Sequence, residues 1–99
     1  MAILHTVNTL SDDGAALKDC LNHIEIGDAI VFMEEAGKYD SIVNNSQYDT
    51  LNAISNPIYI LPYEEQQKTN SNQHKKFNYI DYPKFVSLCC SFNLIQNWY

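Results

Sequence analysis

The stretch that decides the fold is GDAIVFMEE, residues 27–35. Its centre, AIVFM at 29–33, is continuously apolar and does not alternate with polar residues. A strand has this pattern when both of its faces are covered, as in a parallel sheet with helices on either side. Glu34, Glu35 and Gly37 then mark the loop that follows. We therefore predict that residues 29–33 form a strand covered on both faces, in a parallel sheet flanked by helices.

Strand and helix patterns alternate on either side of this stretch. Strands are predicted at 3–7, 58–61, 77–81 and 94–98, and helices at 16–24, at about 41–55 with a break near Asn44–Asn45, and from Pro83 onward. Residues 64–76 are polar and biased, which indicates a short helix followed by a mobile loop. This order predicts a single α/β domain over 1–99. We expect a small, mostly parallel open sheet of about five strands with helices on both faces.

The first predicted helix has an apolar face and recognisable ends. Its apolar face is formed by Ala16, Leu17, Cys20, Leu21 and Ile24. Residues 11–13 offer an N-cap and first-turn acids, and Gly27 is predicted to stop the helix.

Charge and hydropathy narrow the classes of function. The chain of 99 residues has a net charge of −6 at pH 7 and contains no arginine, and its one basic cluster is Lys75–Lys76 beside His74. Nucleic-acid-binding proteins usually present a stripe of Arg and Lys, so direct binding of RNA or DNA is not expected. No apolar stretch approaches the roughly 18 residues of a membrane span. The sequence also shows no basic region typical of a signal peptide.

Motifs for cofactors and metals are missing from the sequence. The three glycines, at 14, 27 and 37, cannot form a phosphate-binding loop of either common kind, and Cys-x-x-Cys does not occur. Cys89 and Cys90 are adjacent, and neighbouring helical side chains point about 100° apart, which argues against a disulfide or zinc pair. We expect no cofactor, no metal and free thiols in a reducing cytoplasm.

Cys20 is the candidate for sulfur chemistry, and two interpretations stay open. Its place on the apolar face favours a buried, inert thiol. Its place in the second half of the helix, where the macrodipole is negative, and the neighbouring Asp19 also disfavour a thiolate. Lys18 and His23 partly offset this effect, so a persulfide site at Cys20 is the alternative.

A second candidate site, for binding, follows from the first predicted strand. His5, Thr6 and Asn8 are placed to reach the carboxyl edge of the sheet, where open α/β sheets bind their ligands. The alternative for His5 is a ring that is hydrogen-bonded within the fold.

Four stretches form a recognisable set that spans most of the chain. They are ILHTVN at 3–8, LKDCL and GDAIVFMEE within 17–35, IYIL at 58–61, and IDYPKFVSL at 80–88 followed by IQNW at 95–98. Together they resemble the TusB/DsrH family of sulfur-relay subunits. The resemblance implies a flavodoxin-like or DsrE-like α/β fold.

The resemblance also implies a function and partners. It implies a mainly architectural or accessory subunit of a cytoplasmic sulfurtransferase complex, the persulfide relay. The implied partners are two homologous subunits, DsrE/DsrF-like or TusD/TusC-like, in a heterohexamer, and small sulfur-carrier proteins. The essential persulfide cysteine usually lies on the DsrE/TusD-type partner. We expect the sulfur to serve 2-thiolation of the tRNA wobble uridine, the more widespread role of the family.

Two alternatives remain. Cys20 matches a cysteine of DsrH-type members that some TusB-type members lack, which implies a DsrH-type subunit of dissimilatory sulfur oxidation with Cys20 as an accessory persulfide site. A small-ligand-binding α/β protein unrelated to sulfur is the alternative of another class. The chain departs from the family at 34–37, where an acid directly followed by glycine is usual. It departs again at 64–76, where the family usually has a helix with Arg-Gly near its end.

Overall fold

A computed structural model describes residues 2–8, 15–37, 42, 46–61 and 77–98. In this part of the chain, five parallel strands form one sheet in the order β4-β3-β2-β1-β5. The strands are β1 (Ile3–Val7), β2 (Ala29–Phe32), β3 (Ile58–Ile60), β4 (Phe77–Tyr79) and β5 (Leu94–Trp98). The helices are α1 (Ala15–His23), α3 (Tyr48–Ala53) and α4 (Tyr82–Ser91), with a short 3-10 helix, η1 (Glu34–Gly37), after β2.

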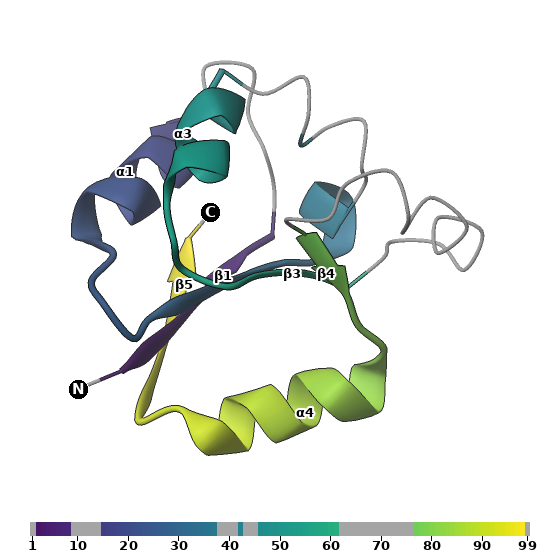
Figure 1. The fold of residues 1–99 in the computed structure, drawn as a ribbon. Helices are drawn as coiled ribbons and strands as arrows, with labels where there is room; N and C mark the ends of the chain where they lie inside the picture. The colour runs from purple at the N-terminus through teal and green to yellow at the C-terminus, as the bar shows by residue number, and fades with distance from the viewer. Residues whose placement is uncertain (1, 9–14, 38–41, 43–45, 62–76, 99) are drawn as a thin grey trace.

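The helices lie in two layers, one on each face of the sheet (Figure 1). α1 and α3 cover one face, which we call the α1 face, and α4 crosses the opposite face, which we call the α4 face. The prediction of a small α/β open sheet with helices on both faces is confirmed. The described strands are all parallel, because the chain returns over a helix or a long connection between each pair of neighbours.

The stretch at 29–33 lies where its pattern predicts. All four residues of β2 are 0% exposed, and β2 lies between β1 and β3 in the middle of the sheet. Ile30 and Phe32 pack into the core of the α1 face, whereas Ala29 and Val31 pack into the core of the α4 face. Alternate side chains of a strand point to opposite faces, so both must be apolar when both faces are covered.

Two hydrophobic cores result from this double cover. The larger core, on the α1 face, contains Val7, Leu17, Cys20, Ile30, Phe32, Ala36, Ile42, Leu51, Ile58, Ile60 and Phe77. The smaller core, on the α4 face, contains Leu4, Ala29, Val31, Ile80 and Leu88. Among the described helices only α4 covers the α4 face, and the core on that face contains fewer buried side chains than the core of the α1 face.

Gly27 has a different role from the predicted one. α1 ends at His23, so the prediction that Gly27 stops this helix is wrong. Gly27 instead lies in a tight turn, where the N–H of Asp28 donates to the carbonyl of Glu25 at 3.0 Å. Its φ of +94° is a conformation that glycine adopts without the steric penalty of a side chain. The turn delivers Asp28 to the start of β2.

Several predicted features lie outside the described residues. These are the N-cap at 11–13, the helix break at Asn44–Asn45 and the whole polar segment 64–76. Within the described residues, the predicted helix at 41–55 appears as α3 and as a helical Ile42. No helix among those residues is long and apolar enough to cross a membrane.

The start of α4 depends on a side-chain cap. Asp81 precedes the helix, and its Oδ1 accepts the backbone N–H of Lys84 at 3.0 Å. Pro83 follows in the first turn, where its missing N–H has no helical partner to lose.

We expect Asp81→Ala to destabilise the protein by about 1 kcal/mol, because a free N–H is left at the helix start. Asp81→Asn is the matched control, since asparagine caps a helix nearly as well. Urea unfolding followed by circular dichroism measures both variants. An equal loss of stability in the two variants would contradict the capping role.

Candidate functional site

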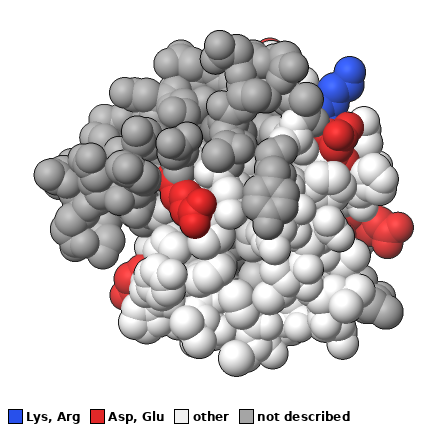
Figure 2. Space-filling model, turned by 180° about the vertical axis from the view of Figure 1, so that it is seen from behind, with Lys and Arg blue, Asp and Glu red and all other residues white. Residues whose placement is uncertain are grey.

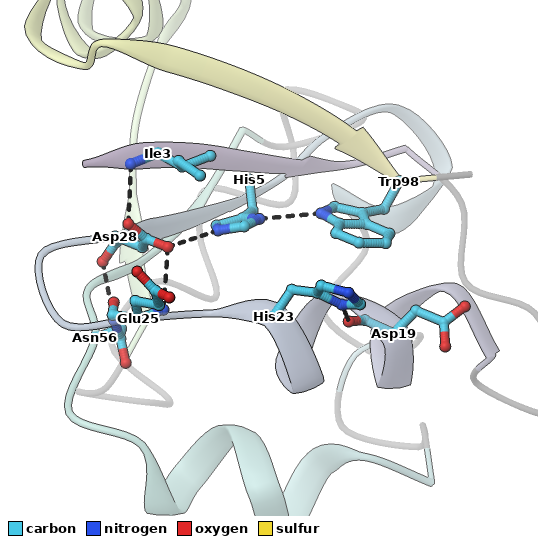
Figure 3. Close-up of polar contacts among 8 residues, drawn as sticks. All are labelled: Ile3, His5, Asp19, His23, Glu25, Asp28, Asn56 and Trp98. Atoms are coloured by element: carbon cyan, nitrogen blue, oxygen red, sulfur yellow. Dashed lines mark hydrogen bonds and ion pairs between the residues drawn. The ribbon is translucent and has the colours of Figure 1, made fainter. Parts of the chain in front are cut away.

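A row of hydrogen bonds crosses the α1 face and links β5, β1 and the start of β2 (Figure 3). The Nε2 of His5 lies 2.9 Å from the Oδ2 of Asp28, and the Nε1–H of Trp98 donates to the Nδ1 of His5 at 3.0 Å. His5 is in the middle of β1, Asp28 directly precedes β2, and Trp98 ends β5. His5 and Asp28 are each 1% exposed.

The geometry determines which nitrogen of His5 carries the proton. The indole N–H of Trp98 can only donate, so the Nδ1 of His5 must accept with its lone pair. The proton of the neutral ring is then on Nε2, and it is donated to the carboxylate of Asp28. A second proton on Nδ1 would face the Trp98 N–H with no acceptor between them. The row therefore fixes the orientation of the His5 ring and one tautomer of its neutral form.

Asp28 accepts three hydrogen bonds through its carboxylate. Besides His5, its Oδ1 accepts the N–H of Ile3 at 2.9 Å and its Oδ2 accepts the N–H of Glu25 at 3.0 Å. Burial raises the pKa of this carboxyl group, but the bonds from His5 and the two backbone N–H groups outweigh burial and hold the pKa below its usual value. Asp28 is therefore a buried carboxylate that stays ionised at neutral pH.

The backbone around Asp28 is also tied to the loop before β3. The side-chain amide of Asn56 donates to the carbonyl of Glu25 at 2.9 Å and to the carbonyl of Asp28 at 3.1 Å. Asn56 thus joins the turn before β2 to the loop before β3 at the amino end of the sheet.

Trp98 lies against a second histidine at the end of α1. The ring centroids of His23 and Trp98 are 5.5 Å apart, and those of His5 and Trp98 are 6.2 Å apart. The side chain of His23 is exposed, and its Nδ1–H donates to the carbonyl of Asp19 at 2.8 Å. Trp98 is therefore held by one buried and one exposed imidazole (Figure 3).

The structure separates the three residues of the predicted binding site. Thr6 lies on the α4 face, where its hydroxyl donates to the side-chain carbonyl of Asn97 in β5. Asn8 lies just past β1 at the carboxyl edge, and its side-chain oxygen is buried without a hydrogen-bond partner in the described part of the chain. His5 is bonded on the α1 face to Asp28, toward the amino edge. The binding role of the three residues stays a prediction, and their side chains do not converge.

Cys20 lies in the core of the α1 face. Its side chain is 0% exposed and packs among apolar residues of the sheet and of α1. Burial, together with the negative charge of Asp28, raises the pKa of this thiol to about 12. Cys20 is therefore a neutral thiol at physiological pH in this conformation. The role of Cys20 in persulfide chemistry stays a prediction.

The other two cysteines lie on α4. Cys89 is half-buried against the core of the α4 face, and Cys90 is exposed. Burial, and then the neighbouring Cys90, raise the pKa of Cys89. Among the described residues, no cluster of three His, Cys, Asp or Glu side chains is arranged to hold a metal ion.

The chain matches the family described as DsrH like protein over residues 11–94. That range holds α1, β2, α3, β3, β4 and α4. The chain belongs to the DsrH-like family. This membership supports a sulfur-relay subunit in general, in agreement with the resemblance seen in the sequence. A comparison with the curated proteins found no match.

Asp28, the carboxylate at one end of the polar row in this DsrH-like chain, was not among the residues predicted from the sequence. Asp28 directly precedes the most apolar stretch of the sequence, so burial of its side chain was to be expected. A buried carboxylate needs hydrogen-bond donors, and a histidine two residues inside the first strand is a candidate donor. That signal does not identify Trp98, because nothing in the sequence places β5 beside β1.

We expect Asp28→Asn to destabilise the protein by about 2 kcal/mol at pH 7, since an amide brings N–H groups toward donors and loses charge-assisted bonds. The pKa of Asp28 is lowered in the folded state, so its contribution is fully present above about pH 4 and is lost as the pH falls through the folded-state pKa. The difference in unfolding free energy between the two proteins should therefore narrow below pH 4.

Asp19→Asn is the control for this measurement, because Asp19 is exposed on α1. Its difference from the unmodified protein should be small and should not show the same narrowing. An Asp28→Asn difference that is unchanged between pH 7 and pH 3 would contradict the role given to the carboxylate.

We expect iodoacetamide at pH 8 to alkylate Cys90 in the folded protein and to spare Cys20, because only a thiolate reacts and Cys20 is buried. In urea, both should react at similar rates. Mass spectrometry of the digested protein reports each site, and a Cys90→Ser variant confirms the assignment. Equal labelling of Cys20 and Cys90 without denaturant would show that the core opens readily.

Proposed function

We propose that this chain is an architectural subunit of a cytoplasmic sulfurtransferase complex that relays persulfide sulfur and serves 2-thiolation of the tRNA wobble uridine. The observation that carries the proposal is the match to the DsrH-like family over residues 11–94. The parallel α/β sheet with helices on both faces agrees with the fold that the resemblance implies.

The state of Cys20 supports an architectural role over a carrier role. In persulfide transfer, an acceptor thiolate attacks the terminal sulfur of the donor persulfide, the donor's sulfur–sulfur bond breaks, and the donor cysteine leaves as a thiolate. A carrier cysteine must therefore be accessible and ionisable. Cys20 is buried and its pKa is raised to about 12, which supports the proposal that the obligatory cysteine lies on the DsrE/TusD-type partner.

The proposed partners are two homologous subunits in a heterohexamer, together with small sulfur-carrier proteins. The aromatic content of 12% and the exposed apolar side chains Tyr82, Val86, Leu94 and Ile95 favour protein partners. The net charge of −6 and the absence of arginine argue against direct contact between this subunit and tRNA.

The first test is assembly with the homologous subunits encoded in the same genome. Co-expression should give one complex that contains all three chains in equal amounts, as measured by native mass spectrometry. A chain that ignores both subunits would contradict the proposal.

The second test is sulfur transfer by that complex with Cys20 replaced. We expect Cys20→Ser to reduce transfer without abolishing it. A buried serine hydroxyl without a hydrogen-bond partner itself costs about 1–3 kcal/mol of stability. Cys20→Ala removes the sulfur without adding a hydroxyl, so comparing the two variants separates these effects. Transfer is measured as mass gain on the acceptor, about 32 Da per sulfur atom, at equal amounts of folded complex. The thiol-free variant of the DsrE/TusD-type partner is the control and should transfer nothing.

Two results together would contradict the architectural role. These are complete loss of transfer in both Cys20 variants and a sulfur adduct mapped to Cys20 in the complex with the unmodified chain. Those results would favour the DsrH-type subunit of sulfur oxidation with a persulfide at Cys20. A complex that transfers sulfur but yields no thiolated tRNA would contradict the tRNA branch alone.

A further inference from the structure

The strand β5 is an outer edge of the sheet, and neither of its faces is fully covered. Among the described strands it pairs only with β1, and its first four residues are exposed. Leu94 is 51% exposed and Ile95 is 47% exposed, and these neighbours point to opposite faces of the sheet. The edge therefore presents apolar side chains on both faces beside an open row of backbone groups.

Within the described residues, this edge has none of the usual protection against pairing. Natural edge strands carry Lys, Pro or inward charges, or are covered by another element. The sequence of β5 is LIQNW, and no charged residue or histidine occurs between Phe85 and Trp98. The chain as a whole carries a net charge of −6. Seen from behind, the lower part of the molecule, where α4 lies in Figure 1, is largely free of charge (Figure 2).

The direction of each backbone group in β5 follows from one hydrogen bond. The carbonyl of Trp98 accepts the N–H of Asn8 at 3.4 Å, so Trp98 directs its backbone groups toward β1. The direction alternates along a strand, so Gln96 also faces β1. Ile95 and Asn97 therefore direct their N–H and C=O groups outward, to the free edge.

We propose that two copies of this chain pair through β5, antiparallel, about a two-fold axis at Gln96. In this register Ile95 of one copy lies opposite Asn97 of the other. Each such pair exchanges two N–H···O=C bonds, and the symmetry makes four bonds in all. Ile95 and Asn97, whose backbone groups point outward, lie one on each side of Gln96. A two-fold axis at Gln96 therefore places the outward groups of one copy directly opposite those of the other.

The side chains fit the same arrangement. On the α1 face, Leu94 of one copy lies opposite the half-buried indole of Trp98 in the other, which is a favourable cross-strand pair. At present the side-chain amide of Gln96 donates to the outward carbonyl of Asn97 at 3.3 Å. In the pair, a backbone N–H takes that place, and the two Gln96 amides meet across the axis.

The charge distribution selects a second copy as the occupant. Two chains of net charge −6 repel each other, and the repulsion is least where the surfaces in contact carry no charge. The edge at β5 is such a surface. An isologous contact also buries the same exposed edge, β5, of both chains at once, so the contact closes with two copies. The inference does not rest on the sulfur relay, and it is compatible with a heterohexamer that contains two copies of this chain.

The test is a charge exchange at Gln96, measured by light scattering on the full-length chain after size-exclusion chromatography. The unmodified chain should be a dimer. Gln96→Lys and Gln96→Glu each place like charges opposite each other, so each should raise the dissociation constant of the dimer at least about tenfold. Mixing the two variants should restore a dimer that contains one of each. Asn78→Lys, on the opposite edge strand β4, is the matched control and should leave the dimer intact.

A disulfide tests the register directly. Residues opposite each other in a non-hydrogen-bonded antiparallel pair have Cα atoms about 4.5 Å apart, within the range of a disulfide. In a Cys90→Ser background, Gln96→Cys should form a covalent dimer under mild oxidation, and Asn78→Cys should not. Circular dichroism confirms that each variant is folded. A monomeric unmodified chain, a dimer indifferent to charge at Gln96, or no disulfide at Gln96→Cys would each overturn the proposal.

Discussion

The buried carboxylate of Asp28 is the interaction on which the arrangement of the sheet depends. It accepts N–H groups from β1, from the turn before β2 and from the ring of His5. An ionised group removed from water is tolerated only when such donors replace its hydration. The donors come from two segments, β1 and the turn before β2, so the carboxylate is satisfied only when these two segments have assembled.

The effect of Asp28 extends to β5 through His5. With its Nε2 proton committed to Asp28, the ring has one lone pair left on Nδ1, and Trp98 donates to it. The indole is thereby fixed at the end of β5, the last strand to be added to the sheet along the chain. A substitution at Asp28 should therefore weaken the hold on Trp98 in β5, because His5 connects the two residues.

Local patterns were sufficient to predict the strands but not the polar row. The continuous apolar run of β2 and the bounds 94–98 of β5 follow from residues close in sequence. The row joins His5 to Asp28 and to Trp98, which are 23 and 93 residues away. Contacts of that separation depend on the order of strands, which composition and spacing do not determine. The side chains of His5 and Thr6 do not converge for a simpler reason, because neighbours in a strand point to opposite faces.

For Cys20, burial could be predicted from the sequence, but the charge of Asp28, which is on another segment, could not. Helical spacing placed it on an apolar face, and burial follows from that placement. The charge that further raises its pKa belongs to Asp28, on a different segment that lies nearby only in the folded chain. From the sequence, the charges expected to act on the pKa of Cys20 are those of Asp19, Lys18 and His23, which are close along the helix. The carboxylate of Asp28 is close to Cys20 only in the folded chain.

The strand β5 is held at its last residue, Trp98, but exposed along the rest of its length, and this affects the free energy of binding at its edge. Trp98 is held by His5 and lies against His23, whereas residues 94–97 are open to solvent. An edge strand that is exposed to solvent ordinarily loses order easily, and binding a partner then has to offset the free-energy cost of ordering it. Here the row from Asp28 to Trp98, and the bonds to β1, already order the strand when the chain folds. Binding at this edge therefore begins from a strand whose conformation is set, so a contact of modest area retains more of its interaction free energy.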